Sequence, residues 1–436
     1  MPPPFFAENM TKIELAWRTP EALLTAFEDV PHLAFLDSGG IVSARSRWSI
    51  LCVHPREILS SNEPDGWAQL QRLLRRKRDD VHHDVPFSGG VIGLASYEAG
   101  LALEGLQSRF RPLIPALTAM AFDGAFIFDR REKRLFWCSD SHSPMPPLPP
   151  PGRVERARTL SRVPLSPDMS ARDWKDAVGA TRASIGRGAL FQANLTSRWH
   201  GDLPDDADIF SLYLRLRETS PAPFGGFLKL PRFSLLSASV ERFIALDRDG
   251  WLETRPIKGT ASIGRDEQED ARIAENLARD AKEYGENLMI TDLMRNDIAR
   301  VCAVGSVSVP ALCQVERFTH VHHLVSTVRG KLACGQTAVD LLRASLPPGS
   351  VTGAPKHAAL KLIDRLEGSA RNAYCGTMFR IGNDGAMDSN VVIRSILISG
   401  GKVEIGAGGG ITYPSDPQRE FDEMCLKAAP LLKLFR

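Results

Sequence analysis

Residues 170–199 read SARDWKDAVGATRASIGRGALFQANLTSRW and contain a helix followed directly by a strand. Ser170 is a suitable first residue for the helix, and Gly186 and Gly188 are suitable to end it. The ALFQANLTSRW that follows has the composition of a strand. Because helices and strands continue to alternate after this stretch, the sequence predicts an α/β fold.

The alternation extends toward the C-terminus, and no internal repeat interrupts it. Glu267 to Val301 is helical in composition, and a final helix is expected from about Asp416. Further predicted elements are strands at 234–247, 251–262, 319–330, 390–399 and 402–408 and a helix at Val339 to Leu346.

On the N-terminal side, short apolar runs at 33–58 and 87–138 predict strands, and 66–80 predicts a helix with a basic outer face. Residues 141–167 are rich in proline, which suits neither a helix nor a central strand. We therefore divide the chain into an N-terminal region, a linker or surface crossing, and a C-terminal catalytic region: residues 1–140, 141–167 and 168–436.

The composition excludes several classes of protein. With 436 residues, 43% hydrophobic and 24% charged, the chain resembles an ordinary globular protein. Its formal charge of +2 gives no basic surface for nucleic acid or an anionic membrane. It shows neither a signal peptide nor 18 consecutive apolar residues, so a cytoplasmic location is expected.

The seven cysteines are scattered, odd in number and free of any C-x-x-C pair, so we interpret them as reduced thiols. None lies in a G-x-C-x-G turn, which would present a nucleophile for glutamine hydrolysis. Any ammonia derived from glutamine would therefore come from another chain.

Two pairs of glutamates have i,i+3 spacing within expected helices: Glu283 with Glu286, and Glu420 with Glu423. Residues three apart share a helix face, and a solvated acidic face is the ordinary interpretation. Both pairs, however, have apolar neighbours, and carboxylates gathered near a core repel one another unless a cation neutralises them. Oxygen ligands favour Mg²⁺ over zinc.

Two glycine-containing segments are candidates for anion sites. GAGGG at 406–410 lets backbone N–H groups approach an anion, although a tight turn explains it equally well. GSVTGAPK at 349–356 fails as a phosphate loop, because three residues separate its glycines and Lys356 precedes a histidine.

Lys258 and the histidines of THVHH are further candidates. Lys258 is either a solvated surface charge or, near a divalent cation and Arg255, an amine whose ammonium form is disfavoured and which becomes nucleophilic. On a strand, His320 and His322 point one way and His323 the other, which argues against a three-histidine metal site.

Five phrases in order resemble the chorismate-utilising enzyme family, over roughly residues 168–436 and more weakly before them. They are SVERF at 239–243, TRPIKGT at 254–260, ENLMITDLMRNDIARV at 286–301, VHHLVSTV at 321–328 and GSVTGAPK at 349–356. The resemblance implies one α/β (α+β) fold in which two antiparallel sheets pack face to face with helices outside.

The resemblance also implies a site for Mg²⁺ and chorismate. Glu286 and Glu423 would bind the metal, with Glu283 and Glu420 supporting through water. Glu241 matches the general acid that helps the C4 hydroxyl leave. The residues matching those that hold the substrate carboxylate or face its ring are Arg394, Tyr374, Lys427, Gly408, Gly409, Gly410, His323 and Thr352.

Two positions indicate the reaction. Water-adding members of the family carry a lysine base where this chain has Gln192, and anthranilate synthases carry alanine at Lys258. Lysine there resembles the branch that forms 4-amino-4-deoxychorismate, a precursor of 4-aminobenzoate and folate, with ammonia from a separate glutamine amidotransferase. An anthranilate synthase is the nearest alternative, and a non-catalytic relative that senses a ligand is another.

The sequence departs from the family at three places: Val240 where proline is usual, TMFRIG at 377–382, and ITYPSDP at 411–417. These departures concern loop geometry and leave the expected ligands intact. FLDS at 35–38 lies where anthranilate synthases carry a tryptophan-sensing motif, although a strand and turn explain it equally well.

Overall fold

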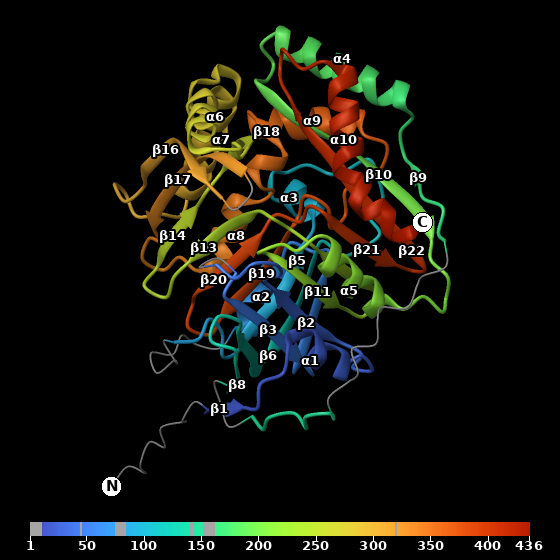
Figure 1. Cartoon of the computed structure of the whole chain (residues 1–436), viewed down its shortest axis with the longest axis vertical. Helices are drawn as coiled ribbons and strands as arrows, with labels where there is room; N and C mark the ends of the chain where they lie inside the picture. Colours follow the sequence, from blue (N-terminus) through green and yellow to red (C-terminus); the bar gives the residue numbers. More distant parts are fainter. Residues whose placement is uncertain (1–10, 44–45, 75–83, 140–142, 151–161, 319–320) are drawn as a thin grey trace.

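Two antiparallel β-sheets, stacked face to face with helices outside them, form the fold (Figure 1). The computed structural model describes residues 11–43, 46–74, 84–139, 143–150, 162–318 and 321–436. This arrangement confirms the fold class expected from the sequence. No helix in the described ranges combines the length and the apolar character needed to cross a bilayer.

The larger sheet has 12 strands within the described ranges, and its neighbouring strands there pair antiparallel. It contains the predicted strand after residue 188, which runs from Gln192 to Asp202. In spatial order its strands are β1 (Thr11–Leu15), β8 (Arg134–Ser139), β7 (Gly124–Asp129), β3 (Trp48–Val53), β2 (Leu33–Asp37), β11 (Gly225–Lys229), β12 (Phe233–Ser237), β21 (Ser395–Ser399), β22 (Lys402–Ile411), β10 (Gln192–Asp202) and β18 (Gly353–Ala354), with β9 (Ser166–Pro167) paired to β10.

The smaller sheet has 10 strands in the same ranges. In spatial order these are β15 (Ile257–Ser262), β17 (Val321–Lys331), β14 (Trp251–Thr254), β13 (Arg242–Leu246), β20 (Met387–Asn390), β19 (Thr377–Gly382), β5 (Gly90–Ala95), β6 (Leu117–Phe122) and β4 (Glu57–Ser61), with β16 (Ser308–Arg317) paired to β17.

Both sheets combine strands from before and after the proline-rich segment. In the larger sheet β2 pairs with β11, and in the smaller sheet β5 pairs with β19. The division into three sequence regions stays a prediction about the chain, while the two sheets are built jointly by the first and the third of them.

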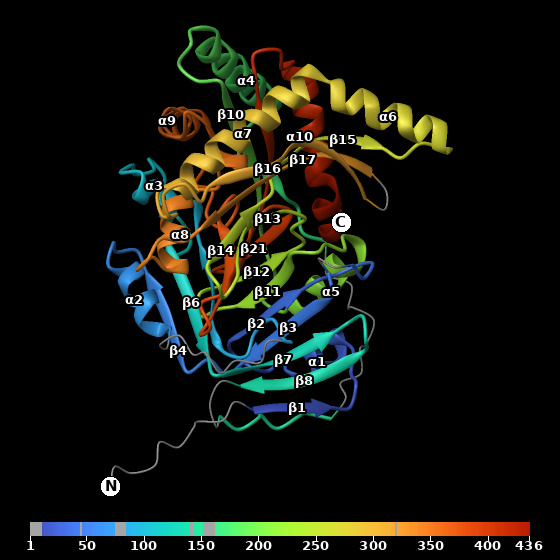
Figure 2. The ribbon, with the colours of Figure 1, turned by 90° about the vertical axis from the view of Figure 1, so that its left-hand side faces the viewer.

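The helices lie outside the sheets, as the view in Figure 2 makes clear. They are α1 (Pro20–Ala26), α2 (Gly66–Leu73), α3 (Tyr97–Leu103), α4 (Ala171–Gly186), α5 (Ile209–Thr219), α6 (Glu267–Arg279), α7 (Ala281–Ala299), α8 (Ala338–Ser345), α9 (Lys356–Leu366) and α10 (Pro417–Leu432), with 3₁₀ turns η1 (Gly349–Val351) and η2 (Lys433–Phe435).

Local capping explains where the helices begin. Ser170 accepts a hydrogen bond from the amide of Asp173 and starts α4, as predicted. The segment predicted as one helical stretch from Glu267 is two helices, because Asp280 ends α6 and caps α7. The expectation of strands throughout 87–138 is wrong at α3, where Ser96 caps a helix inside an apolar run.

Alternation along the strands builds the core. In β2, Ala34 packs between the sheets together with residues of β5 and β6, such as Ile92 and Met120. Its neighbour Phe35 faces the opposite way and packs against Tyr213 of α5. Successive side chains of a strand point to opposite faces, so one strand serves both the layer between the sheets and the layer under the helices.

Candidate active site

A cavity of about 720 Å³, partly open to solvent, is lined by β10 and β22 of the larger sheet, β15 of the smaller sheet, η1 and α10. Segments distant in the sequence form its wall. The lining residues are Asn194, Val240, Glu241, Lys258, Ser350, Val351, Tyr374, Ile393, Arg394, Gly406, Ala407, Gly408, Gly409, Gly410 and Lys427. The structure thus gathers both predicted catalytic residues and six of the predicted substrate-binding residues around one space.

Lys258 reaches this cavity from β15, next to an irregularity in the pairing of β15 with β17. Gly259 makes that irregularity possible, because its φ of +76° is a conformation that suits glycine. In the described part of the chain, the Lys258 amine has no hydrogen bond or ion pair. Arg255, expected beside it, is instead paired with Glu316.

Glu241 lies on the same wall, directly before β13. Ser350 Oγ donates a hydrogen bond to Glu241 Oε1 at 2.6 Å. Burial raises the pKa of Glu241, while the bond from Ser350 and the charge of Lys258 act to lower it without cancelling the rise. A carboxyl group with a raised pKa keeps its proton to higher pH, as a general acid requires.

The GAGGG segment is part of strand β22, so its interpretation as a tight turn is wrong. A Cβ on Gly406 would lie 2.3 Å from the Tyr374 ring, and one on Gly408 would lie 2.1 Å from the Leu195 carbonyl oxygen. Glycine is required there because the neighbouring strand and the tyrosine approach so closely. The approach of Tyr374 is what makes that side chain part of the cavity wall.

The Arg394 side chain is exposed and forms no hydrogen bond or ion pair with the residues that the structure describes. Its φ of +50° lies in the left-handed region, which is uncommon for a residue other than glycine. Lys427 of α10, in contrast, donates to the Gly408 carbonyl oxygen at 3.1 Å and pairs with Glu423 Oε1 at 2.7 Å. Of the two cations expected to hold a carboxylate, Arg394 therefore has a side chain without a partner in the described residues, whereas Lys427 is already hydrogen-bonded and ion-paired.

Glu283 and Glu286 lie on α7, which packs on β15 and β17, and Glu420 and Glu423 lie on α10, which packs on the glycine strand β22. A Cβ on Gly409 would lie 3.5 Å from Glu420 Oε2 and 3.6 Å from the Lys427 amine, so α10 borders the cavity there. Burial raises the pKa of Glu286 and of Glu420. At Glu423 burial also acts to raise the pKa, but the ion pair with Lys427 and the charges of Lys282 and Lys258 together lower it.

These carboxylates fit Mg²⁺ by donor chemistry. In the described ranges no three histidine, cysteine or acidic side chains converge closely enough to enclose a metal. Mg²⁺ commonly keeps several waters and takes only one or two carboxylates from the protein, so a closed protein cage is not needed. The mutual repulsion of Glu286, Glu420 and Glu423 is what a cation would relieve.

Two of the predicted substrate-binding residues do not line the cavity, and neither do the four glutamates. Thr352 is fully buried, and its hydroxyl donates to the carbonyl oxygens of Pro348 and Gly349. His323 Nδ1 lies 2.9 Å from Thr260 Oγ1 of β15. Their predicted contacts with the substrate stay predictions.

His322 and Lys356 agree with the interpretations made from sequence. His322 is buried with Nε2 2.8 Å from Asp270 Oδ1, away from the bond made by His323, while His320 lies outside the described residues. Lys356 is buried, and its amine pairs with Asp297 Oδ2 at 2.6 Å. A lysine so engaged does not serve a phosphate loop.

Seven lining residues were not among the predicted site residues: Asn194, Val240, Ser350, Val351, Ile393, Gly406 and Ala407. Ser350 and Val351 lie within the GSVTGAPK phrase, and Asn194 lies two residues after Gln192, on the same face of β10. Gln192 is buried, and its Oε1 has no hydrogen-bond partner within the described ranges. A Cβ on Gly410 would lie 2.2 Å from Gln192 Nε2 and 3.7 Å from the Lys258 amine.

Comparison with known proteins agrees with this geometry. Residues 35–433 match the chorismate binding enzyme family. Aminodeoxychorismate synthase component 1 of Escherichia coli K12 is 35% identical, with 97% of each chain covered. Anthranilate synthase component 1 of Thermus thermophilus is 38% identical, covering 81% of this chain and 79% of the relative.

A solved structure supports the same assignment. Anthranilate synthase component I of Streptococcus pneumoniae TIGR4 superposes with a TM-score of 0.78 at 28% identity, covering 90% of this chain and 94% of that one. The two stacked sheets, the cavity between them and the match over residues 35–433 lead to one conclusion. The chain belongs to the chorismate binding enzyme family.

Proposed function

We propose that this protein converts chorismate and ammonia to 4-amino-4-deoxychorismate and water, as the chorismate-binding component of an aminodeoxychorismate synthase. The observation that carries the proposal is Lys258 at the cavity wall, with an amine that no described residue binds. Relatives named aminodeoxychorismate synthase component 1 match over nearly their whole length, which supports it. The cytoplasmic location stays a prediction.

The proposed reaction assigns a separate task to each group. The Lys258 amine, once neutral, forms a bond to C2 of chorismate, and the C4 hydroxyl leaves as the double bond shifts. Glu241, whose pKa burial raises, gives the proton that turns the leaving hydroxide into water. Ammonia then adds at C4 and its extra proton returns to Glu241, while the C2–N bond to Lys258 breaks and releases the lysine as a free amine.

Other residues of the cavity would orient the substrate. Arg394 is suited to a carboxylate of chorismate because its planar fork is bidentate and permanently charged. Tyr374 and the Gly408–Gly410 strand would hold the ring against Lys258. Glu286 and Glu423 would hold Mg²⁺, supported by Glu283 and Glu420, and the cation would supply positive charge to the second carboxylate.

The source of ammonia is inferred from the properties of the cysteines. The seven cysteines are free thiols, five of them buried, and burial raises the pKa of Cys52, Cys138 and Cys375. A thiol with a raised pKa is a poor nucleophile. We therefore propose a separate glutamine amidotransferase as the source of ammonia.

Anthranilate synthesis is the second candidate, because a relative of that name is 38% identical. The purified chain should be incubated with chorismate, Mg²⁺ and an ammonium salt, and the product identified by mass spectrometry and fluorescence. We expect a non-fluorescent amino product that retains the pyruvyl group. Fluorescent anthranilate with released pyruvate would establish the alternative, and no product at all would indicate a ligand-sensing relative.

Glutamine provides the control for the partner. We expect glutamine to give no product with this chain alone, and ammonium to give product increasingly as pH rises and more ammonia is neutral. Product formed from glutamine by the purified chain would contradict the proposed division of labour.

A further inference from the structure

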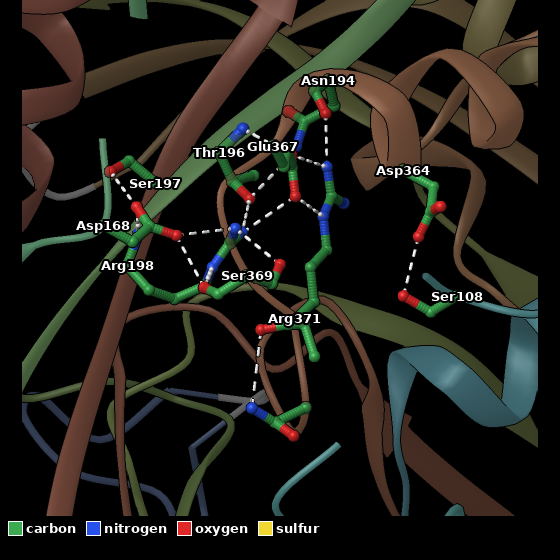
Figure 3. Close-up of polar contacts among 12 residues, drawn as sticks. Ser108, Asp168, Asn194, Thr196, Ser197, Arg198, Asp364, Glu367, Ser369 and Arg371 are labelled. Atoms are coloured by element: carbon green, nitrogen blue, oxygen red, sulfur yellow. Dashed lines mark hydrogen bonds and ion pairs between the residues drawn. The ribbon is translucent and has the colours of Figure 1, made fainter. Parts of the chain in front are cut away.

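Two arginines are buried side by side beneath the cavity, and only one of them touches its wall. Arg198 of β10 and Arg371 are 0% and 1% exposed in their side chains, and both pair with Glu367 (Figure 3). Arg198 also pairs with Asp168 at 2.9 Å. Two cations thus face two carboxylates in an apolar interior.

Arg371 makes three contacts with residues that line the cavity. Its Nη1 donates to the Val351 carbonyl oxygen at 2.8 Å, and its Nη2 donates to the Asn194 carbonyl oxygen at 2.6 Å. Its own carbonyl oxygen accepts from the Tyr374 amide at 2.9 Å. One residue therefore connects η1, β10 and the loop before β19.

The Arg198 side chain makes no such contact. Its guanidinium donates to Thr196 Oγ1, to Glu367, and to the hydroxyl and carbonyl of Ser369. None of these partners is among the residues lining the cavity. The two arginines thus share burial and the Glu367 carboxylate but differ in whether they reach the wall.

Glu367 fixes the orientation of Arg371. Its Oε2 accepts from Arg371 Nε at 3.0 Å and its Oε1 accepts from Arg371 Nη2 at 2.6 Å. With one edge of the guanidinium held in this way, the remaining N–H groups point to the two carbonyl oxygens. Because the guanidinium is planar and its donors diverge, a lysine ammonium cannot satisfy the same set.

We propose that Arg371 is a positioning residue for substrate binding: its side chain sets the cavity wall by holding Asn194 and Val351 in register. This rests on the proposed chorismate site. A buried ion pair alone is weak grounds for a functional role, since such pairs are often replaceable without loss of stability. The two side-chain bonds to the backbone of lining residues distinguish Arg371 from a pair that only fills the interior.

The test compares Arg371→Lys with Arg198→Lys in the full chain, with chorismate, Mg²⁺ and ammonium. Both substitutions keep the charge and disturb the same buried cluster, so both should lower the Tm. We expect Arg371→Lys to raise KM for chorismate by about tenfold or more, since small displacements of binding groups cost up to about 100-fold. Arg198→Lys should stay within about twofold of the wild-type KM.

Equal KM values for the two variants would overturn the inference, whether both rise or neither does. If Arg371→Lys does not fold, the paired change Arg371→Met with Glu367→Gln removes both charges together and leaves no lone buried ion. It should raise KM likewise, and a wild-type KM would overturn the inference. Failure of the wild-type chain to turn over chorismate would instead refute the proposed function.

Discussion

The bond between Ser350 and Glu241 makes the proposed acid testable through pH. Ser350 donates to Glu241 Oε1 at 2.6 Å, and this bond favours the carboxylate form. Ser350→Ala removes the donor, so the pKa of Glu241 should rise further above its ordinary value. If the protonated carboxyl is the active form, activity lost as pH rises should persist to higher pH in this variant.

The size of the shift follows from the kind of bond removed. A hydrogen bond to a charged group contributes about 1.5–3 kcal/mol, and 1.36 kcal/mol corresponds to one pH unit. Glu241 is only partly buried, so water replaces some of the lost bond, and the lower end applies. We expect the alkaline limb of the profile of kcat against pH to move upward by about one unit.

Glu241→Gln is the companion variant, because the amide keeps the shape and the acceptor for Ser350 but gives no acidic proton. General acid catalysis contributes about 10²–10⁴-fold, so kcat should fall by that range. Rates should be measured with saturating chorismate and a constant concentration of neutral ammonia at each pH. A wild-type kcat in Glu241→Gln, or an alkaline limb that Ser350→Ala leaves in place or moves downward, would refute the assignment.

Three further predictions concern the metal, the substrate and the nucleophile. Glu286→Gln or Glu423→Gln should abolish turnover and Mg²⁺-dependent chorismate binding measured by calorimetry, and full activity in either variant would remove that ligand from the metal site. Arg394→Ala should raise KM by roughly 30-fold, or about 2 kcal/mol, the low end for a charged contact because this arginine is exposed; an unchanged KM would contradict the role. Chorismate without ammonia should leave a mass adduct on the peptide containing Lys258, and Lys258→Ala should lose that adduct and most of the activity; wild-type rates in this variant would exclude covalent catalysis.

Features that depend on neighbours in the sequence could be predicted. Ser170 and the glycines after it bound α4, and the i,i+3 spacing placed each glutamate pair on one helix. Such features arise from capping and helix periodicity, which act over one or two turns. The five phrases located the family for the same reason, since each is a contiguous stretch of residues.

Features that depend on contacts between distant parts of the chain could not be predicted from the sequence. The strand at 402–408 was predicted, but the reason for the glycines of GAGGG was not, because they are needed only where β10 and Tyr374 approach β22 so closely. No pattern in the sequence indicated that Glu316 of β16 would pair with Arg255. No local pattern records which strand or side chain will arrive from elsewhere.

The sequence by itself therefore determined the residue types available for the chemistry, including Lys258, Glu241 and the four glutamates. Only the tertiary structure decided which of them share a cavity and what surrounds each. Burial and Ser350 set the proton affinity of Glu241, and Arg371 joins Asn194 to Val351 across 157 positions of sequence. Burial and hydrogen bonding are properties of packed neighbours, and packing joins residues without regard to their separation along the chain.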